Sequence, residues 1–320
     1  MALTDLSEAE LPNYRSAQTE EADFDAFWTE TLEDARSHPL DVVVEPVETD
    51  LTTIDAYDVT FSGFGGDRIK AWLRVPAGSS GQLPTVVEFM GYGGGRGRAQ
   101  ERLMFSSSGF AHLSVDTRGQ GSNGSIGDTP DPHGSAPHGP GFMTFGIESR
   151  ESYYYRRVFT DAVRAIEAAR SLAIVDETRV AAYGGSQGGG ISLAATSLIG
   201  DLAASVFHVP FLCDFPRSTR ITDLDPYKEI GRYLAVHRAK TADVHRVLSY
   251  FDGVNFAKRA TTPGVFTAAL MDPICPPSTV YGAFNNYAGD KTITLWQYNG
   301  HEGGGVDDEI TAVRYFREVL

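Results

Sequence analysis

The stretch that most constrains the fold is Thr178–Gly190, which reads TRVAAYGGSQGGG. A β-branched, apolar run stops at Gly-x-Ser-x-Gly and continues into small residues that suit the start of a helix. Gly184 and Gly188 flank Ser186 where strand and helix pass so closely that a Cβ would clash, and the serine sits at strained backbone angles. A five-residue match can also be a glycine-rich turn with a structural serine, so the rest of the chain must discriminate.

A nucleophilic serine in this strand-turn-helix context needs an acid and a histidine later in the chain, each on a loop after a strand. The run VFTAALMD at 265–272 predicts a buried strand that stops at Asp272, because Pro273 cannot continue a sheet ladder. The run TITLWQY at 292–298 predicts the next strand, which breaks just before His301. Asp272 is therefore the candidate orienting acid and His301 the candidate general base. Taken alone, Asp272 could instead be a helix N-cap, which is the less favoured alternative.

An acyl-transfer site also needs two hydrogen-bond donors for the developing oxyanion. The backbone N–H of Gln187, directly after Ser186, is one candidate. The second is the backbone N–H of Tyr92, because the predicted strand TVVEFM at 85–90 leads into the glycine-rich loop 91–95. The alternative for this loop is a flexible surface connection. A phosphate-binding loop is disfavoured, because the chain has neither the phosphate-loop pattern with Gly-Lys-Ser/Thr nor the dinucleotide fingerprint.

Three motifs together resemble a known family. Gly-Ser-Gln-Gly-Gly-Gly at 185–190, Arg118-Gly119-Gln120 and His301-Glu302 are similar to the signatures of carbohydrate esterase family 7, the acetyl xylan esterases and cephalosporin C deacetylases. The resemblance spans nearly the whole chain, since further segments also read like that family: DFDAFWTET at 23–31, YYYRRVFTDAVRAIEAA at 153–169, PFLCD at 210–214 and LSYFDGVNFA at 248–257.

The resemblance implies the same site as the positional argument, with Ser186, Asp272 and His301 as the triad and the Tyr92 and Gln187 amides as the oxyanion hole. For Arg118, Gly119 and Gln120 it implies a family signature, in which bracing the active-site loops is at least as expected as substrate contact. It also implies removal of acetyl groups from small acetylated sugars, xylo-oligosaccharides and cephalosporin C. No metal and no cofactor is expected, and the family's assembly is a cytoplasmic homohexamer.

Composition excludes several other classes of function. The formal net charge of −15 argues against a nucleic-acid or anionic-membrane partner, because such binding depends on basic patches. Two cysteines, Cys213 and Cys275, are too few for a disulfide scaffold and suit a reducing compartment. The first residues, MALTDLSEAELPNY, lack the basic and apolar regions of a signal peptide, and no apolar run reaches about 18 residues. We therefore expect a cytoplasmic protein.

The order of patterns along the chain predicts the fold class. Strand-like runs at 69–75, 85–90, 111–116, 179–183 and 205–210 alternate with helical runs at 153–170 and 189–199, which indicates βαβ units and a mostly parallel sheet flanked by helices. We expect a single α/β-hydrolase domain over 1–320. Residues 1–37 should form an N-terminal capping segment, with helical spacing around Phe24, Phe27 and Trp28. Residues 211–262 should form a helical insertion before the triad acid.

These observations favour a serine esterase that removes acetyl groups from small acetylated carbohydrates through an acyl-enzyme intermediate. A small acetylated carbohydrate is the expected substrate, and the chain is expected to form a homo-oligomer. Because the triad alone does not choose the leaving group, a thioesterase or a peptidase on the same fold remains an alternative. A further alternative is a binding protein on a hydrolase scaffold without catalytic activity.

Overall fold

A nine-stranded sheet forms the centre of the molecule, seen in a computed structural model that describes residues 5–134 and 139–320. In spatial order its strands are β1 (Val43–Val47), β2 (Ile54–Ser62), β3 (Arg68–Pro76), β5 (Ala111–Val115), β4 (Leu83–Phe89), β8 (Val175–Gly185), β9 (Ala204–His208), β10 (Gly264–Ala269) and β11 (Lys291–Trp296). Strands β5, β4, β8, β9, β10 and β11 pair in parallel, while β1, β2 and β3 are antiparallel to their neighbours. The expected α/β architecture with a mostly parallel sheet is confirmed.

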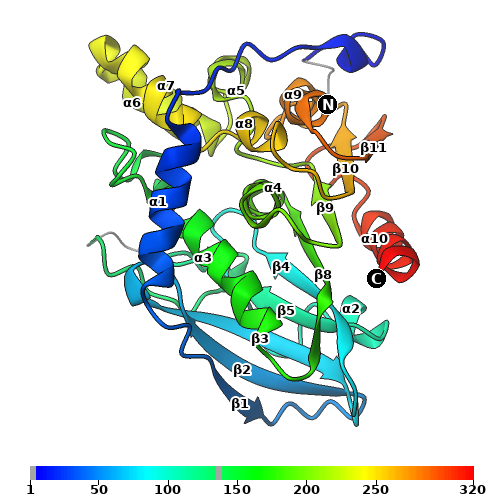
Figure 1. Cartoon of the computed structure of the whole chain (residues 1–320). Coiled ribbons are helices and arrows are strands. Elements are labelled where there is room, and N and C mark those ends of the chain that lie inside the picture. Colours follow the sequence, from blue (N-terminus) through cyan, green and yellow to red (C-terminus); the bar gives the residue numbers. More distant parts are fainter. Residues whose placement is uncertain (1–4, 135–138) are drawn as a thin grey trace.

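Helices cover both faces of this sheet (Figure 1). The α-helices are α1 (Phe24–Arg36), α2 (Met104–Ser107), α3 (Tyr154–Arg170), α4 (Gln187–Ile199), α5 (Phe215–Ile221), α6 (Tyr227–Val236), α7 (Thr241–Ser249), α8 (Gly253–Ala257), α9 (Pro277–Asn286) and α10 (Val306–Val319). Short 3₁₀ turns are η1 (Leu11–Asn13), η2 (Phe64–Gly66), η3 (Phe142–Thr144) and η4 (Arg238–Lys240), and β6 (Ser122–Asn123) pairs with β7 (Ser125–Ile126) in a small hairpin. Helices α3 and α4 pack on one face, and α2 and α10 lie on the other.

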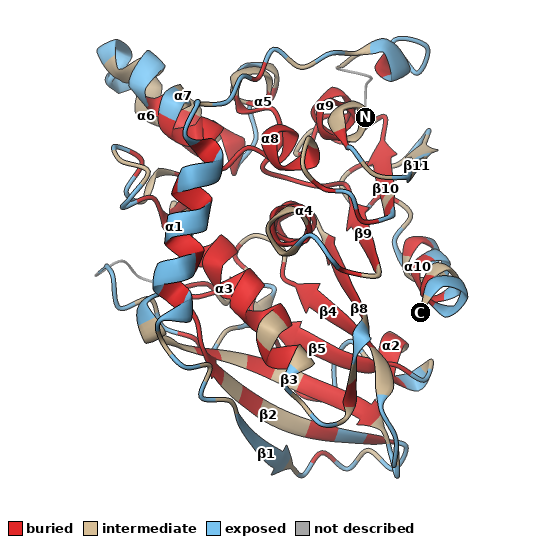
Figure 2. Ribbon diagram, viewed as in Figure 1, coloured by how far each residue is buried: buried red, intermediate tan, exposed pale blue. Residues whose placement is uncertain are grey.

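The alternation of side chains along β8 explains why the core has two parts. Val180 and Ala182 point into the large cluster shared with α3 and α4, whereas Ala181 and Tyr183 point into the smaller cluster shared with α2 and α10. All four residues are buried, and Figure 2 shows the central strands and the inward sides of these helices as buried. A central strand of this kind is apolar on both faces, so a continuous apolar run in the sequence predicts it.

Helices α5 to α8 occupy the range 211–262 and gather at one end of the molecule (Figure 1). The N-terminal segment before β1 contacts this end of the molecule at two points. Tyr14 Oη donates to Asp214 Oδ2 at 2.7 Å, and Trp28 Nε1 in α1 donates to the Tyr250 carbonyl at 2.9 Å. The first four residues of the expected capping segment 1–37 lie outside the described residues. Within the described part of the chain, no helix is both long enough and apolar enough to span a membrane.

Some strand ends differ from the sequence prediction. β10 ends at Ala269, three residues before Asp272, and β11 ends at Trp296. The two strands pair only from Gly264 opposite Lys291 to Ala269 opposite Trp296, so both ladders stop together. The residues after Ala269 are therefore free to turn and carry Asp272 into a loop.

Candidate active site

The serine turn joins β8 directly to α4. Ser186 has φ 55° and ψ −121°, a left-handed backbone conformation that is strained for a residue with a side chain. A Cβ on Gly184 would lie 2.3 Å from the carbonyl carbon of Gly188, and a Cβ on Gly188 would lie 2.0 Å from the carbonyl oxygen of Phe89. Only glycine fits at both positions, as the sequence predicts, and the turn projects the Ser186 hydroxyl into a cavity.

The structure brings the three predicted triad residues together. Ser186 Oγ lies 2.9 Å from His301 Nε2, and His301 Nδ1 lies 2.8 Å from Asp272 Oδ2. Because an ionised carboxylate can only accept hydrogen bonds, Nδ1 carries the ring proton and donates it, which leaves Nε2 as the acceptor for the serine hydroxyl. His301 is about one quarter exposed on the cavity side, whereas the Asp272 side chain is fully buried.

Asp272 is held in position by the loop that follows it. Its Oδ1 accepts hydrogen bonds from the backbone N–H groups of Ile274 at 2.8 Å and Cys275 at 2.9 Å. Asp272 Oδ2 is thereby left to accept the hydrogen bond from His301 Nδ1. The N-cap-like bonding that the sequence allowed as an alternative is thus present in the same side chain, and it orients the carboxylate instead of excluding the triad geometry.

Cys275 adds a group that the sequence did not assign to the site. Its thiol is fully buried. Its sulfur, a carboxylate oxygen of Asp272 and a ring nitrogen of His301 all lie within 4.8 Å of one another. Burial raises the pKa of the Cys275 thiol well above its usual range, which favours the neutral thiol beside the triad.

The glycine-rich loop after β4 lies beside the serine turn. Tyr92 and Ser186 line the same cavity, and Gln187 follows Ser186 directly. Within the described residues, the backbone N–H groups of Tyr92 and Gln187 have no hydrogen-bond acceptor. Two unpaired donors next to a serine hydroxyl are the arrangement that stabilises a tetrahedral oxyanion.

The side chain of Gln120 connects this loop to the serine turn. Its Oε1 accepts from the Gly93 N–H at 2.6 Å, and its Nε2 donates to Gln187 Oε1 at 3.0 Å and to Tyr154 Oη at 3.1 Å. The Gln187 amide in turn donates to the Met90 carbonyl at 3.2 Å. Gln120 is fully buried and does not line the cavity around Ser186. Its contacts are those of a brace between two loops.

Arg118 is buried among carboxylates. Its guanidinium donates to both oxygens of Asp161 at 2.6 and 2.8 Å, to Asp67 at 2.8 Å and to Asp131 at 3.4 Å. A planar guanidinium with bidentate pairing is a rigid cross-link. Gly119, with φ 69°, turns the chain between Arg118 and Gln120. Arg118 and Gly119 lie outside the lining of the Ser186 cavity, so the structure places this whole motif behind the site.

The side chain of Tyr92 ties the same loop to α6. Tyr92 Oη donates to Glu229 Oε1 at 2.7 Å and accepts from the backbone N–H groups of Gly141 at 3.2 Å and Phe142 at 3.0 Å. Glu229 Oε2 accepts from the Met143 N–H at 3.1 Å. Burial raises the pKa of Glu229 above its usual range. Sequence reasoning missed Glu229, because a single acid on a predicted amphipathic helix carries no local signal that distinguishes it from a solvent-exposed one.

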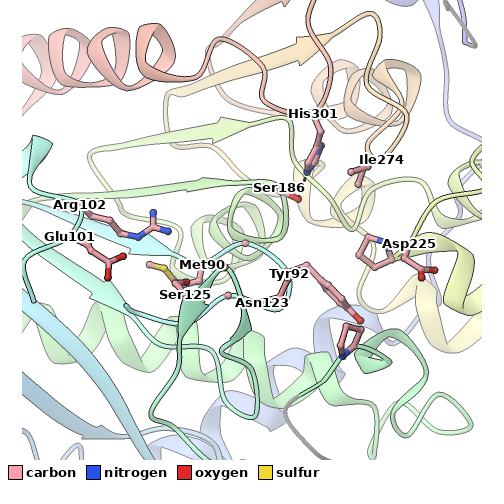
Figure 3. Close-up of a pocket in the computed structure, with 15 residues that line it drawn as sticks. Met90, Tyr92, Glu101, Arg102, Asn123, Ser125, Ser186, Asp225, Ile274 and His301 are labelled. Carbon is pink, nitrogen blue, oxygen red and sulfur yellow. Dashed lines mark hydrogen bonds between the residues drawn. The ribbon is translucent and has the colours of Figure 1, made fainter. Parts of the chain in front are cut away.

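The cavity has a volume of about 570 Å³, within the range of small-molecule sites. Figure 3 shows Ser186 and His301 between a side with Tyr92 and Ile274 and a side with Glu101 and Arg102. Its full lining is Met90, Gly91, Tyr92, Gly94, Glu101, Arg102, Asn123, Gly124, Ser125, Pro140, Ser186, Asp225, Pro226, Ile274 and His301.

Comparison with known proteins agrees with this geometry. Residues 1–318 match the family model described as acetyl xylan esterase (AXE1). The acetyl esterase Axe7A of Xylanibacter ruminicola is 31% identical over 286 residues, which are 87% of this chain and 63% of that protein, so this chain spans less than two thirds of its relative.

Two solved structures are similar over nearly their full lengths. The acetyl xylan esterase from Paenibacillus sp. R4 has a TM-score of 0.92 at 38% identity, covering 98% of this chain and 100% of that one. Acetyl xylan esterase 1 from Thermoanaerobacterium sp. JW/SL YS485 has a TM-score of 0.90 at 29% identity, covering 99% of each chain. These matches confirm the resemblance drawn from the three motifs, and the chain belongs to the acetyl xylan esterase family.

Proposed function

We propose that this protein is a serine esterase that removes acetyl groups from small acetylated carbohydrates such as xylo-oligosaccharides. The observation that carries the proposal is the hydrogen-bonded chain from Ser186 Oγ through the His301 ring to Asp272, at 2.9 and 2.8 Å, inside an open cavity. The names of its similar proteins support the acetyl ester as substrate. Cephalosporin C is the second acetyl ester that we propose to test as a substrate.

The proposed reaction runs in two acyl-transfer steps. Ser186 Oγ attacks the acetyl carbonyl carbon while its proton passes to His301 Nε2. The bond from the carbonyl carbon to the sugar oxygen then breaks, and the imidazolium returns the proton to that oxygen, so the sugar leaves as an alcohol. A water molecule repeats the sequence on the acetyl-serine and releases acetate. Asp272 holds the His301 tautomer and stabilises the ring when it is charged.

The oxyanion formed in both steps is assigned to the backbone N–H groups of Tyr92 and Gln187. Both donors belong to rigid segments, because Gln120 ties the loop of Tyr92 to the side chain of Gln187. Preorganised donors of this kind lower the barrier without reorganising during the reaction.

The test is release of acetate from acetylated xylo-oligosaccharide and from cephalosporin C by the wild-type protein, Ser186→Ala and Ser107→Ala. Ser107 is exposed on α2 and does not line the cavity, so it serves as a matched control. We expect turnover of the sugar ester by wild type and Ser107→Ala, and a loss of several decades in Ser186→Ala, on the order of 10⁴ to 10⁶ for a triad nucleophile. Folded wild-type protein that releases no acetate from either compound would contradict the proposal.

We also propose that the chain assembles as a homo-oligomer, with a hexamer as the specific expectation. Light scattering coupled to size-exclusion chromatography measures the mass directly against the 34.7 kDa chain. A mass of one chain at micromolar concentration would reject this part of the proposal without affecting the esterase assignment.

A further inference from the structure

The cavity around Ser186 has two chemically different ends (Figure 3). On one side of the nucleophile, Tyr92 and Ile274 present mainly apolar surface, and the carboxylate of Asp225 lies on the same side. On the other side the lining is polar and comes from Glu101, Arg102, Asn123 and Ser125. An acetyl group needs only a small apolar space, whereas the alcohol that leaves with it is a polyol. The polar end therefore has the chemistry of the leaving-group side.

One edge of the Arg102 guanidinium group is hydrogen-bonded to the protein, and, among the residues described, the other edge is free. Its Nη1 donates to Glu88 Oε1 at 2.7 Å, and the buried Glu88 is itself held by His112 Nε2 at 2.9 Å from Oε2. Its backbone has φ 56°, in the left-handed region, and 39% of its side chain is exposed. In the described part of the chain, the Nε and Nη2 groups have no hydrogen-bond partner. The guanidinium is thus a fixed plane with free N–H donors at the cavity.

Glu101 supplies acceptors next to these donors. Its Oε1 accepts from the Arg98 backbone N–H at 2.9 Å, which orients the carboxylate. Among the residues that the structure describes, it makes no ion pair at 4.0 Å or less. Its charge is offset by the guanidinium groups of Arg102 and Arg74, both of which interact electrostatically with it.

We propose that Glu101 and Arg102 form a subsite that binds vicinal hydroxyl groups of a neutral sugar, the leaving group of the reaction proposed above, on which this inference rests. Each sugar hydroxyl is both a donor and an acceptor, so adjacent hydroxyls match a carboxylate beside a guanidinium edge. The subsite selects acetyl esters of polyols over those of alcohols that carry no further hydroxyl group.

The experiment compares an acetylated xylo-oligosaccharide with phenyl acetate, whose leaving group has no hydroxyl to bind. Arg102→Lys keeps a cation opposite Glu88 but removes the planar donors, and Glu101→Gln removes the charge at nearly constant shape. Arg98→Gln is the matched control, because Arg98 is exposed in the same loop and does not line the cavity. Thermal melting checks that each variant is folded.

We expect the ratio of kcat/KM for the sugar ester to kcat/KM for phenyl acetate to fall about tenfold in Arg102→Lys and Glu101→Gln, mainly through KM, as for the loss of one charged hydrogen bond. Arg98→Gln should keep the wild-type ratio.

Three outcomes would overturn the subsite. An unchanged ratio in both variants shows that the sugar binds elsewhere, and an equal loss on both substrates shows a general disturbance of the site. If the wild-type protein hydrolyses phenyl acetate but not the sugar ester, both the proposed function and the subsite are rejected. This outcome can be told apart from failure of the subsite alone, because it is seen in the wild-type protein without any variant.

Discussion

Gln120 and Gln187 bind each other through reciprocal amide hydrogen bonds, Nε2 of Gln120 to Oε1 of Gln187 at 3.0 Å and Nε2 of Gln187 to Oε1 of Gln120 at 3.1 Å. Both side chains are fully buried. Gln187 directly follows the proposed nucleophile, and Gln120 holds the loop of Tyr92 by accepting from the Gly93 N–H at 2.6 Å. The pair therefore sets the distance between the two proposed oxyanion donors without touching the cavity.

Replacing Gln120 by Leu should reduce both stability and turnover. The change leaves the buried Gly93 N–H without its acceptor, which costs about 1 to 3 kcal/mol, whereas the Gln187 amide keeps its bonds to Met90 and Tyr155. A shift of the loop by about 1 Å lowers kcat by about 10²-fold. Denaturant unfolding and steady-state kinetics measure the two effects. Gln100→Leu, an exposed position, should change neither, and a Gln120→Leu enzyme with wild-type kcat would refute the bracing role.

Replacing Gly188 by Ala should prevent the serine turn from forming correctly. The added Cβ would lie 2.0 Å from the Phe89 carbonyl oxygen, a backbone atom that cannot move aside cheaply. We expect a loss in the free energy of unfolding of about 3 kcal/mol or more, at the upper end of overpacking effects. Gly81→Ala meets no atom within 4 Å and should stay within about 0.5 kcal/mol of wild type. Equal unfolding midpoints for the two variants would disprove the close approach.

Replacing Asp272 by Asn tests the orientation of His301. The Asn oxygen can still accept from Ile274 and Cys275, but its NH₂ group then faces Nδ1 and favours the wrong tautomer of the ring. On the precedent of serine proteases, kcat should fall by about 10⁴ with little change in KM. Acetate release over a range of substrate concentrations measures this. Asp290→Asn, exposed before β11, is the control, and a fall of less than about tenfold in Asp272→Asn would remove Asp272 from the triad.

The pH dependence of stability should contain a contribution from His208. Burial lowers the pKa of this histidine from 6.5 to about 4, against the opposing effect of Asp308. The folded protein therefore binds fewer protons than the unfolded chain between these values, and stability is lost as pH falls through this window. The contribution is on the order of 3 kcal/mol between pH 7 and pH 4.

His208→Gln removes that proton uptake from the unfolded state, so its free energy of unfolding should fall less steeply than that of wild type between pH 6.5 and pH 4. Urea unfolding at several pH values gives the slopes. The exposed His237→Gln should retain the wild-type slope. Parallel curves for wild type and His208→Gln would show that His208 does not titrate as a buried neutral group.

Several parts of the fold and site carry local signals in the amino-acid sequence. The strands β4, β5, β8 and β9 are short apolar runs, and parallel strands buried on both faces have that composition. The serine turn is dictated by two glycines whose added Cβ atoms would touch backbone. Asp272 and His301 are predictable because each follows a strand-like run, although the second of these strands, β11, is only partly buried. The antiparallel β1 and β2 were not predicted, although β2 carries a period-two pattern in IDAYDVTFS.

The amino-acid sequence by itself therefore determined the alternating strands and helices of the parallel part of the sheet, the turn at Ser186 and the candidate triad residues, because each of these has a signal in its own local segment. Tertiary structure alone decided which distant side chains meet: Gln120 with Gln187, Tyr92 with Glu229, and Cys275 with His301. Those pairings depend on how loops from different strands converge at one edge of the sheet. Glutamine, glutamate or cysteine in a loop has no periodicity that reveals its partner.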